Sequence, residues 1–175
     1  MFKIEEKKGQ FYLIAAVVIS SLIIGISIAG NTSLKTKNTD FYDLAEEIRI
    51  ESKKTIDAAT SSGFQSNEII LLMENFTNNY IKKSFNRTDL YFIFGDSNNI
   101  TLSGYQKEAK LVEIESGNEI NTTSPGRFSI SIDPQLQNLN LTIDQKPFSF
   151  EIMPGQNFYF VLIQTKNNEE YIEIG

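Results

Sequence analysis

An uncharged segment of 19 residues, Phe11 to Ala29, lies near the amino terminus and constrains the chain more than any other feature. As an α-helix it would be about 28 Å long, which is enough to cross the hydrocarbon core of a bilayer. Its serines can donate their hydroxyls to carbonyls of the same helix, so they do not oppose insertion. A buried core helix is the alternative, but an uncharged stretch of this length at one end disfavours it. The sequence therefore predicts a membrane helix over residues 10–30, in contact with lipid through residues 11–29.

The charges around this segment indicate its orientation. Lys7 and Lys8 stand directly before the apolar residues, and basic residues at the end of a membrane helix favour the cytoplasmic side. We therefore expect residues 1–9 to be a cytoplasmic or leader segment and everything after residue 30 to lie outside the cell membrane. Residues 31–175 carry 13 basic and 20 acidic side chains, so the part expected outside has a net charge of −7.

Residues 7–16, KKGQFYLIAA, resemble the class III signal peptide of archaeal type IV pilin-like proteins. In that family a basic pair, a Gly and a Gln precede the apolar helix, which stays on the mature protein after cleavage. The resemblance covers about the first 30 residues, and it implies that a prepilin-type peptidase cuts between Gly9 and Gln10. The same opening also resembles that of small single-pass archaeal envelope proteins.

Two other fates of the segment stay open. It can remain as an uncleaved anchor, or it can be a secretory signal cut after Ser27-Ile28-Ala29, which has the small-x-small form of a cleavage site. The apolar run exceeds the usual h-region of about 7–15 residues, which favours retention in the membrane. Many pilins carry Glu where this chain has Ile14, and Gly30 begins a polar stretch that interrupts the helix. Both features favour a domain that does not assemble.

Composition excludes several classes of function. The chain has no Cys and no His, so disulfides, zinc-thiolate sites and Ser-His-Asp triads are absent. Its net charge of −6 opposes nucleic-acid binding, which needs a basic patch. We expect no cofactor, no metal site and no enzymatic activity. Paired carboxylates are the remaining catalytic option, but no pattern brings two of them together; the candidates are Asp133, Asp144, Glu151 and Glu173.

Beyond the membrane segment the sequence predicts a linker over 31–39 and a helical region over 40–85. Apolar residues recur at helical spacing over 40–60 and over 67–84, with Asp40 and Ser66 as expected N-caps. The Ser61-Ser62-Gly63 stretch separates the two segments. We therefore expect two helices that pair as a short antiparallel hairpin and bury their apolar faces in the domain's own core.

From residue 86 onward the apolar pattern changes to a period of two. About eight short strands are expected between residues 89 and 174, at the spacing typical of an antiparallel β-sandwich. The predicted fold class is therefore α+β, with a membrane helix, a helical hairpin and a carboxy-terminal β-sandwich over residues 86–175. Within it we expect Phe150 and Phe160 to be core residues of a strand pair joined at Pro154-Gly155.

Two polar features could bear on function. Asn-x-Ser/Thr sequons occur at six positions, which makes them candidate N-glycosylation sites in an extracytoplasmic domain; they are Asn31, Asn75, Asn86, Asn99, Asn121 and Asn140. Residues 96–99, DSNN, could ligate calcium through side-chain oxygens, but Asp and Asn are also favoured in turns for backbone reasons. The turn is the preferred interpretation.

These observations predict a single-pass, membrane-anchored extracytoplasmic protein that is a pilin-like structural or adhesive component of the cell envelope. Its expected partners are membrane lipid, a prepilin-type peptidase, and further copies of itself or other envelope proteins. The alternative is a membrane-tethered β-sandwich binding domain that does not assemble. An extracytoplasmic hydrolase is a distant third.

Cleavage before the apolar helix is the sharpest of these expectations. Gly9→Val should abolish cleavage between Gly9 and Gln10, because a β-branched side chain restricts the backbone that the peptidase must accommodate. Membrane insertion should persist, since the apolar segment is unchanged. Mass spectrometry of the protein from the membrane fraction measures the mature amino terminus. An intact start in the wild type, or a start at Gly30, would contradict the prediction.

Overall fold

The computed structural model describes residues 38–84, 87–114, 119–121, 125–132 and 138–175. The predicted membrane segment at 10–30, the processing site at Gly9 and Gln10, and the sequons at Asn31 and Asn86 lie outside the described residues. In the part that the structure describes, no helix is long and apolar enough to cross a membrane. Residues Asp40–Gly175 form one compact unit.

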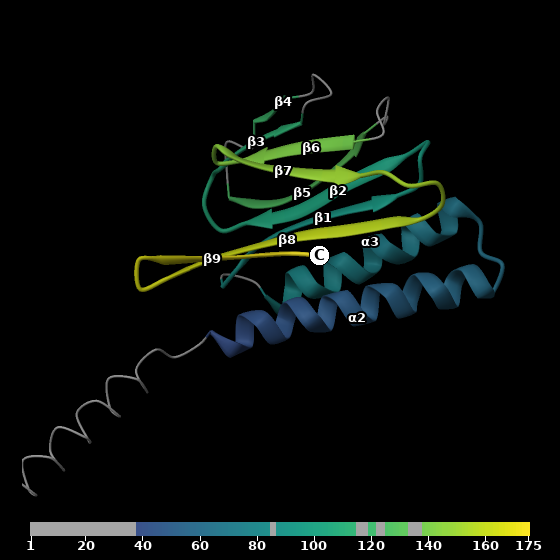
Figure 1. Ribbon diagram of the computed structural model, residues 1–175, viewed down its shortest axis with the longest axis horizontal. Coiled ribbons are helices and arrows are strands. Elements are labelled where there is room, and N and C mark those ends of the chain that lie inside the picture. The colour runs from purple at the N-terminus through teal and green to yellow at the C-terminus, as the bar shows by residue number, and fades with distance from the viewer. Residues whose placement is uncertain (1–37, 85–86, 115–118, 122–124, 133–137) are drawn as a thin grey trace, which may run out of the picture. The chain divides into compact units, whose positions relative to one another are not determined.

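Two antiparallel helices, α2 (Thr39–Ser61) and α3 (Ser66–Lys83), run side by side along one face of this unit (Figure 1). Each buries a stripe of apolar residues at three- and four-residue spacing. The buried apolar side chains are Phe41, Ala45, Ile48 and Ala59 of α2 and Ile69, Ile70, Met73, Tyr80 and Ile81 of α3. The predicted helical hairpin is confirmed, and each boundary lies within one residue of its expected position.

Both predicted N-caps are wrong, because Asp40 and Ser66 lie inside the first turns of the helices. α2 begins at Thr39, which places Asp40 in its first turn. Gln65 caps α3, and its backbone N–H donates to a carboxylate oxygen of Glu68 at 2.8 Å. The hydroxyl of Ser66 does not cap the helix. It donates instead to the carboxylate of Asp96, in the turn after the first strand.

Nine strands form two antiparallel sheets within the described residues, so the α+β class is confirmed. One sheet has five strands in the order β5-β2-β1-β8-β9, and the other has four in the order β4-β3-β6-β7. The strands of the larger sheet are β1 (Asp89–Gly95), β2 (Ile100–Gln106), β5 (Gly126–Ile132), β8 (Asn157–Lys166) and β9 (Glu169–Ile174). Those of the smaller sheet are β3 (Leu111–Ile114), β4 (Glu119–Asn121), β6 (Asn138–Ile143) and β7 (Lys146–Glu151). Strand β4 was not predicted from the sequence.

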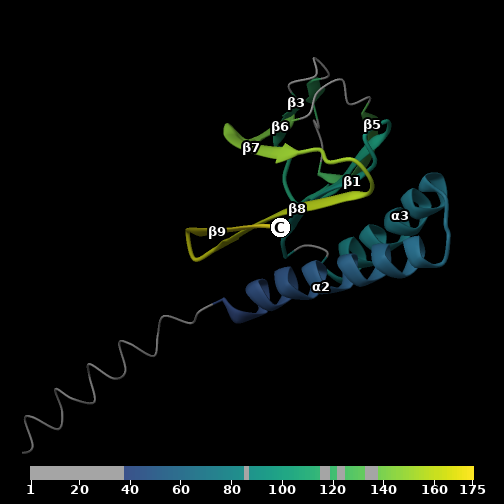
Figure 2. The same ribbon diagram turned by 45° about the vertical axis from the view of Figure 1, so that its right-hand side comes forward.

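The helices, the larger sheet and the smaller sheet lie in three layers (Figures 1 and 2). The larger sheet is the middle layer, and its strands β1 and β2 are buried on both faces. One face packs against the helices through residues such as Leu90, Phe92 and Phe160. The other packs against the smaller sheet through residues such as Tyr91 and Ile93. The fold therefore has two apolar cores separated by a single sheet.

The connection at Pro154-Gly155 is not the hairpin that the sequence suggested. β7 pairs with β6 in the smaller sheet, whereas β8 pairs with β1 and β9 in the larger one. The segment between them crosses from one sheet to the other. Phe150 and Phe160 are both buried, as predicted, but they belong to different cores.

This separation leads to a stability prediction. Phe160→Ala and Phe150→Ala should each lower the free energy of unfolding by roughly 3–5 kcal/mol, because each removes a buried aromatic ring. Their effects should add in the double variant, since the two rings lie on opposite sides of the larger sheet. Thermal unfolding of the full chain in detergent measures this. Phe64→Ala is the control, because Phe64 is 46% exposed. Unchanged unfolding of both core variants would contradict the described packing.

Candidate functional site

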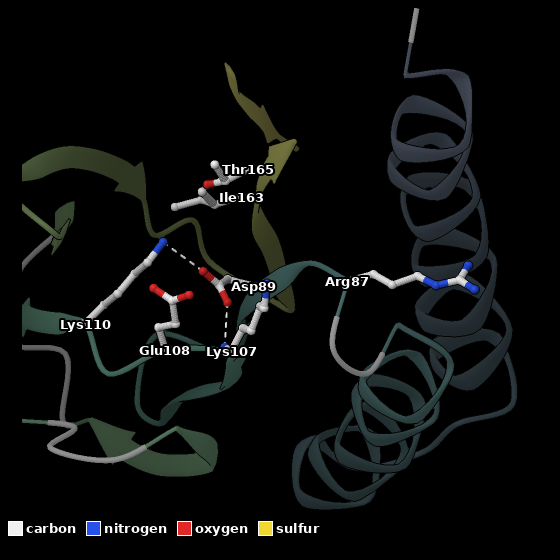
Figure 3. Close-up of a pocket in the computed structure, with 7 residues that line it drawn as sticks. All are labelled: Arg87, Asp89, Lys107, Glu108, Lys110, Ile163 and Thr165. Carbon is white, nitrogen blue, oxygen red and sulfur yellow. Dashed lines mark hydrogen bonds and ion pairs between the residues drawn. The ribbon is translucent and has the colours of Figure 1, made fainter. Parts of the chain in front are cut away.

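A small polar pocket of about 50 Å³ opens where β1 begins and β2 ends (Figure 3). Asp89 is its central residue. Its carboxylate lies 2.8 Å from the ammonium nitrogen of Lys110 and accepts the backbone N–H of Lys107 at 2.6 Å. The side chains of Asp89 and Lys110 are only 8% and 16% exposed. The remaining lining residues are Arg87, Glu108, Ile163 and Thr165.

The polar groups at the centre of this pocket are hydrogen-bonded or ion-paired to one another. Gln106 donates to the Tyr91 hydroxyl at 3.1 Å and to the backbone carbonyl of Lys110 at 3.3 Å. Burial, and then the nearby Asp89 carboxylate, raises the pKa of Tyr91, which keeps its hydroxyl protonated. Figure 3 shows the Arg87 side chain pointing away from the ion pair, toward the helices. A volume of about 50 Å³ suits one or two water molecules. We interpret this pocket as a brace that holds the chain between β2 and β3.

A second polar cluster forms at the opposite end of β1. The Asp96 carboxylate accepts the hydroxyl of Ser66 and the backbone N–H groups of Asn98 and Asn99, at 2.8 and 3.0 Å. The hydrogen bond from Ser66 is the main reason that the pKa of Asp96 lies below its ordinary value. Gln156 donates to the Ser66 hydroxyl at 2.9 Å and ties the β7–β8 connection to the same point.

These contacts favour the turn interpretation of residues 96–99, because they use both oxygens of Asp96. The turn also requires Gly95, which has a φ of +136° and whose added Cβ would lie 2.1 Å from the Asn99 carbonyl oxygen. Among the described residues, no group of three or more Asp or Glu side chains is placed to hold a metal ion.

A larger groove of about 290 Å³ lies between α3 and the outer strand β5. One wall comes from α3, the floor from β2, and the outer side from β5. The lining residues are Glu74, Asn78 and Ile81 of α3, Ser103 of β2, and Arg127, Phe128 and Ser129 of β5. Its volume is at the lower end of the range for small-molecule sites, about 300–1,000 Å³.

The groove exists because the helices are narrower than the sheet beneath them. α3 packs on β1 and β2, while α2 reaches β8 and β9, where the rings of Phe41 and Tyr171 lie 6.3 Å apart. β5 extends past α3. In the sheet register Arg127 is opposite Tyr105 and Ser129 is opposite Ser103, so both share the helix-facing side. Both are exposed there, because no helix covers them.

The polar residues of the groove differ from those of the other two clusters. In the part of the chain that the structure describes, five of them have no side-chain hydrogen bond or ion pair to another residue; they are Glu74, Asn78, Ser103, Arg127 and Ser129. Four are at least partly exposed, and Ser103 is 5% exposed on the floor. Glu74 and Arg127 carry opposite charges, so the groove is neutral overall. Its donors and acceptors are available to a ligand.

The structure does not bring the predicted glycosylation sites together. Asn75 is exposed on α3, although the Thr77 hydroxyl of its sequon is buried and donates to the Glu74 carbonyl at 3.1 Å. Asn99 is exposed beside the turn and accepts the Ser131 hydroxyl at 2.7 Å. Asn140 is half-buried on β6 and accepts the Ser149 hydroxyl at 2.7 Å. Asn121 lies at the end of β4.

The candidate carboxylates are also separated. Asp144 is exposed in the β6–β7 turn, Glu151 is exposed at the end of β7, and Glu173 is half-buried on β9. Asp133 lies outside the described residues. Glu151 therefore faces solvent, whereas Glu173 is partly covered.

The groove was missed at the level of sequence. The alternation of Arg127, Ser129 and Ser131 with Phe128 and Ile130 indicates one polar face of a strand. Nothing in that pattern places Glu74 and Asn78 beside this strand.

The chain matches no protein-family model, no curated protein and no solved structure.

The contrast between the brace and the groove predicts a large loss of stability for a variant of the brace and almost none for variants of the groove. Asp89→Asn should lower the free energy of unfolding by about 3 kcal/mol, because it removes the carboxylate that lies 2.8 Å from the largely buried ammonium group of Lys110. Glu74→Gln and Arg127→Gln should each change it by less than about 0.5 kcal/mol, since neither side chain has a partner to lose. Chemical denaturation of the full chain in detergent measures all three. A large loss in either groove variant would show that the groove is structural.

Proposed function

We propose that this chain is a single-pass protein of the cell envelope whose β-sandwich domain stands outside the membrane and binds a ligand in the groove between α3 and β5. The observation that carries the proposal is the set of unpaired polar side chains in that groove. The uncharged segment at residues 11–29, with Lys7 and Lys8 before it, supports the anchor and the orientation. The role is adhesive and not catalytic.

The chemistry of the groove favours a neutral, hydroxyl-rich ligand such as an oligosaccharide. Glu74 accepts hydrogen bonds, Arg127 donates them, and Asn78 and the two serines can do both. A sugar hydroxyl is both donor and acceptor, so one ring can satisfy all of these groups. Residues 40–175 carry 11 basic and 20 acidic side chains, and this net charge of −9 disfavours an anionic ligand at long range.

The absence of catalysis is supported by the same geometry. Glu74 is the only carboxylate among the residues that line the groove, and a glycosidase needs two on either side of the scissile bond. The guanidinium of Arg127 has donors and no acceptor, so it cannot act as a general base. The groove therefore supplies binding groups without an acid–base pair.

Assembly into a pilin-like structure is the leading interpretation of the amino-terminal resemblance, and a tethered domain that does not assemble is the second candidate. One observation favours the second. The outward side of α2 carries the exposed residues Asp43, Glu46, Lys53 and Asp57, which suit contact with water better than contact with other helices.

Binding to intact cells tests the location and the groove together. Cells that display the full chain should retain fluorescently labelled neutral oligosaccharides, and protease added to intact cells should abolish retention. Arg127→Gln and Glu74→Gln should each weaken binding by roughly 10-fold or more, because each removes a charge-assisted hydrogen bond. Lys166→Gln is the matched control, since Lys166 is an exposed cation outside the groove.

The outcomes separate the two parts of the proposal. Protease-resistant binding would place the domain on the wrong side of the membrane. Equal binding by the wild type and both groove variants would exclude the groove as the binding site. It would not contradict the proposed location outside the membrane. A labelled anionic oligosaccharide that binds better than the neutral ones would overturn the ligand class.

A further inference from the structure

The outer strands of the two sheets are not equally protected against pairing with another chain. β9 carries Glu169, Glu170 and Glu173, and β7 carries Lys146, Pro147 and Glu151. β4 is only three residues long. Charges, proline and short length are the usual devices that prevent an edge strand from pairing. β5 is seven residues long, and its single charged residue is Arg127.

The hydrogen-bond pattern shows which backbone groups β5 leaves available. Asp96 donates its backbone N–H to the Asn99 carbonyl at 3.1 Å, so the backbone groups of Asn99 point toward β1. The side toward which the backbone N–H and C=O groups point alternates from one residue of a strand to the next. The backbone groups of Ile100, Leu102 and Gly104 therefore point toward β5. Their register partners there are Ile132, Ile130 and Phe128. The N–H and C=O groups of the residues between them, Arg127, Ser129 and Ser131, therefore point away from the sheet.

We propose that two copies of this chain associate by antiparallel pairing of their β5 strands, with Ser129 of one copy opposite Ser129 of the other. The two five-stranded sheets then become one continuous sheet across a two-fold axis. The available N–H and C=O groups of Arg127, Ser129 and Ser131 form the new ladder. Pairing centred on Ser129 matches the full length of β5, Gly126–Ile132, with itself.

The side chains of β5 are self-complementary in this register. Arg127 lies opposite Ser131 on the helix-facing side, and Phe128 lies opposite Ile130 on the side that faces the smaller sheet. A slip by one residue would set polar against apolar side chains. The two Arg127 residues are four positions apart along the ladder, about 14 Å, which exceeds the screening length of about 10 Å. The arrangement therefore has no direct repulsion between like charges.

This inference goes beyond the proposed function, because the new ladder uses the backbone of β5 and the ligand uses side chains of the groove. The proposed strand pairing and the proposed ligand binding can therefore be contradicted independently of each other. Loss of ligand binding in Arg127→Gln or Glu74→Gln has no bearing on the ladder, and a monomeric chain could still bind sugar.

Introducing a negative or a positive charge at Ser129 tests the register of the proposed strand pairing. The full chain in mild detergent should sediment as a dimer. Ser129→Asp and Ser129→Lys should each raise the dissociation constant at least 10-fold, because each sets like charges directly opposite one another. An equimolar mixture of the two variants should restore the dimer, since the charges then attract. Ser149→Asp and Ser149→Lys are the matched controls, because Ser149 is also an exposed serine of an outer strand.

A proline variant tests the backbone ladder without changing charge. Ser131→Pro removes an N–H that points away from the sheet, so the pairing of β5 with β2 keeps its hydrogen bonds. It should abolish the dimer and leave the melting temperature within a few degrees of the wild type. Ile130→Pro should unfold the strand, because that N–H points toward β2.

The protein contains no cysteine, so a single introduced thiol reports the contact without background. Ser129→Cys in intact membranes should give a covalent dimer with a short thiol-specific cross-linker, and Lys54→Cys on α2 should not. A wild-type chain that is monomeric at all concentrations would overturn the proposal. Dimers that persist in Ser129→Asp, Ser129→Lys and Ser131→Pro would overturn it equally.

Discussion

Burial of β1 and β2, the inner strands of the larger sheet, on both faces is the constraint on which the rest of the structure depends. Every residue of β1 and β2 is buried, and β1 alternates Leu90, Phe92 and Phe94 toward the helices with Tyr91 and Ile93 toward the smaller sheet. Such a strand cannot face water on either side, so it requires a layer above and a layer below. The helical hairpin and the smaller sheet are these two layers. Removing either one would expose an entire apolar face.

The covering layers are not as wide as the sheet they cover. Two adjacent helices cover roughly four strands, because helix axes lie about 8–10 Å apart and strands about 4.8 Å apart. The larger sheet has five strands, and α2 and α3 reach β9, β8, β1 and β2. β5 is therefore left uncovered on its helix-facing side, and its residues there are Arg127, Ser129 and Ser131 instead of apolar ones. The groove and the open edge both result from this difference in width.

Much of the fold could be predicted because its strands and helices carry strong local patterns. The period of two that predicts strands between residues 89 and 174 matches the doubly apolar strands β1 and β8 and the alternating strands β6 and β7. The asparagines at 167 and 168, with φ of 55° and 62°, form the turn between β8 and β9, which Asn favours because it tolerates positive φ. Pairing was harder to predict, because Pro154-Gly155 suits a hairpin and a crossover between sheets equally well. The groove could not be predicted at all, since α3 and β5 are more than 40 residues apart in the chain.

The uncovered strand β5 connects the two proposals in one physical argument. Ser129 lines the groove and also lies at the centre of the proposed strand pairing, so pairing would place two grooves on the same side of the joined sheet, close to the two-fold axis. A groove of about 290 Å³ contacts only a small part of an oligosaccharide, so the affinity of a single groove is expected to be weak. Two grooves held at a fixed separation bind a repetitive polymer more tightly, because the second contact is intramolecular once the first has formed. The proposed adhesive domain, with its small site, therefore gains binding strength from the proposed self-pairing without any new side-chain contact to the ligand.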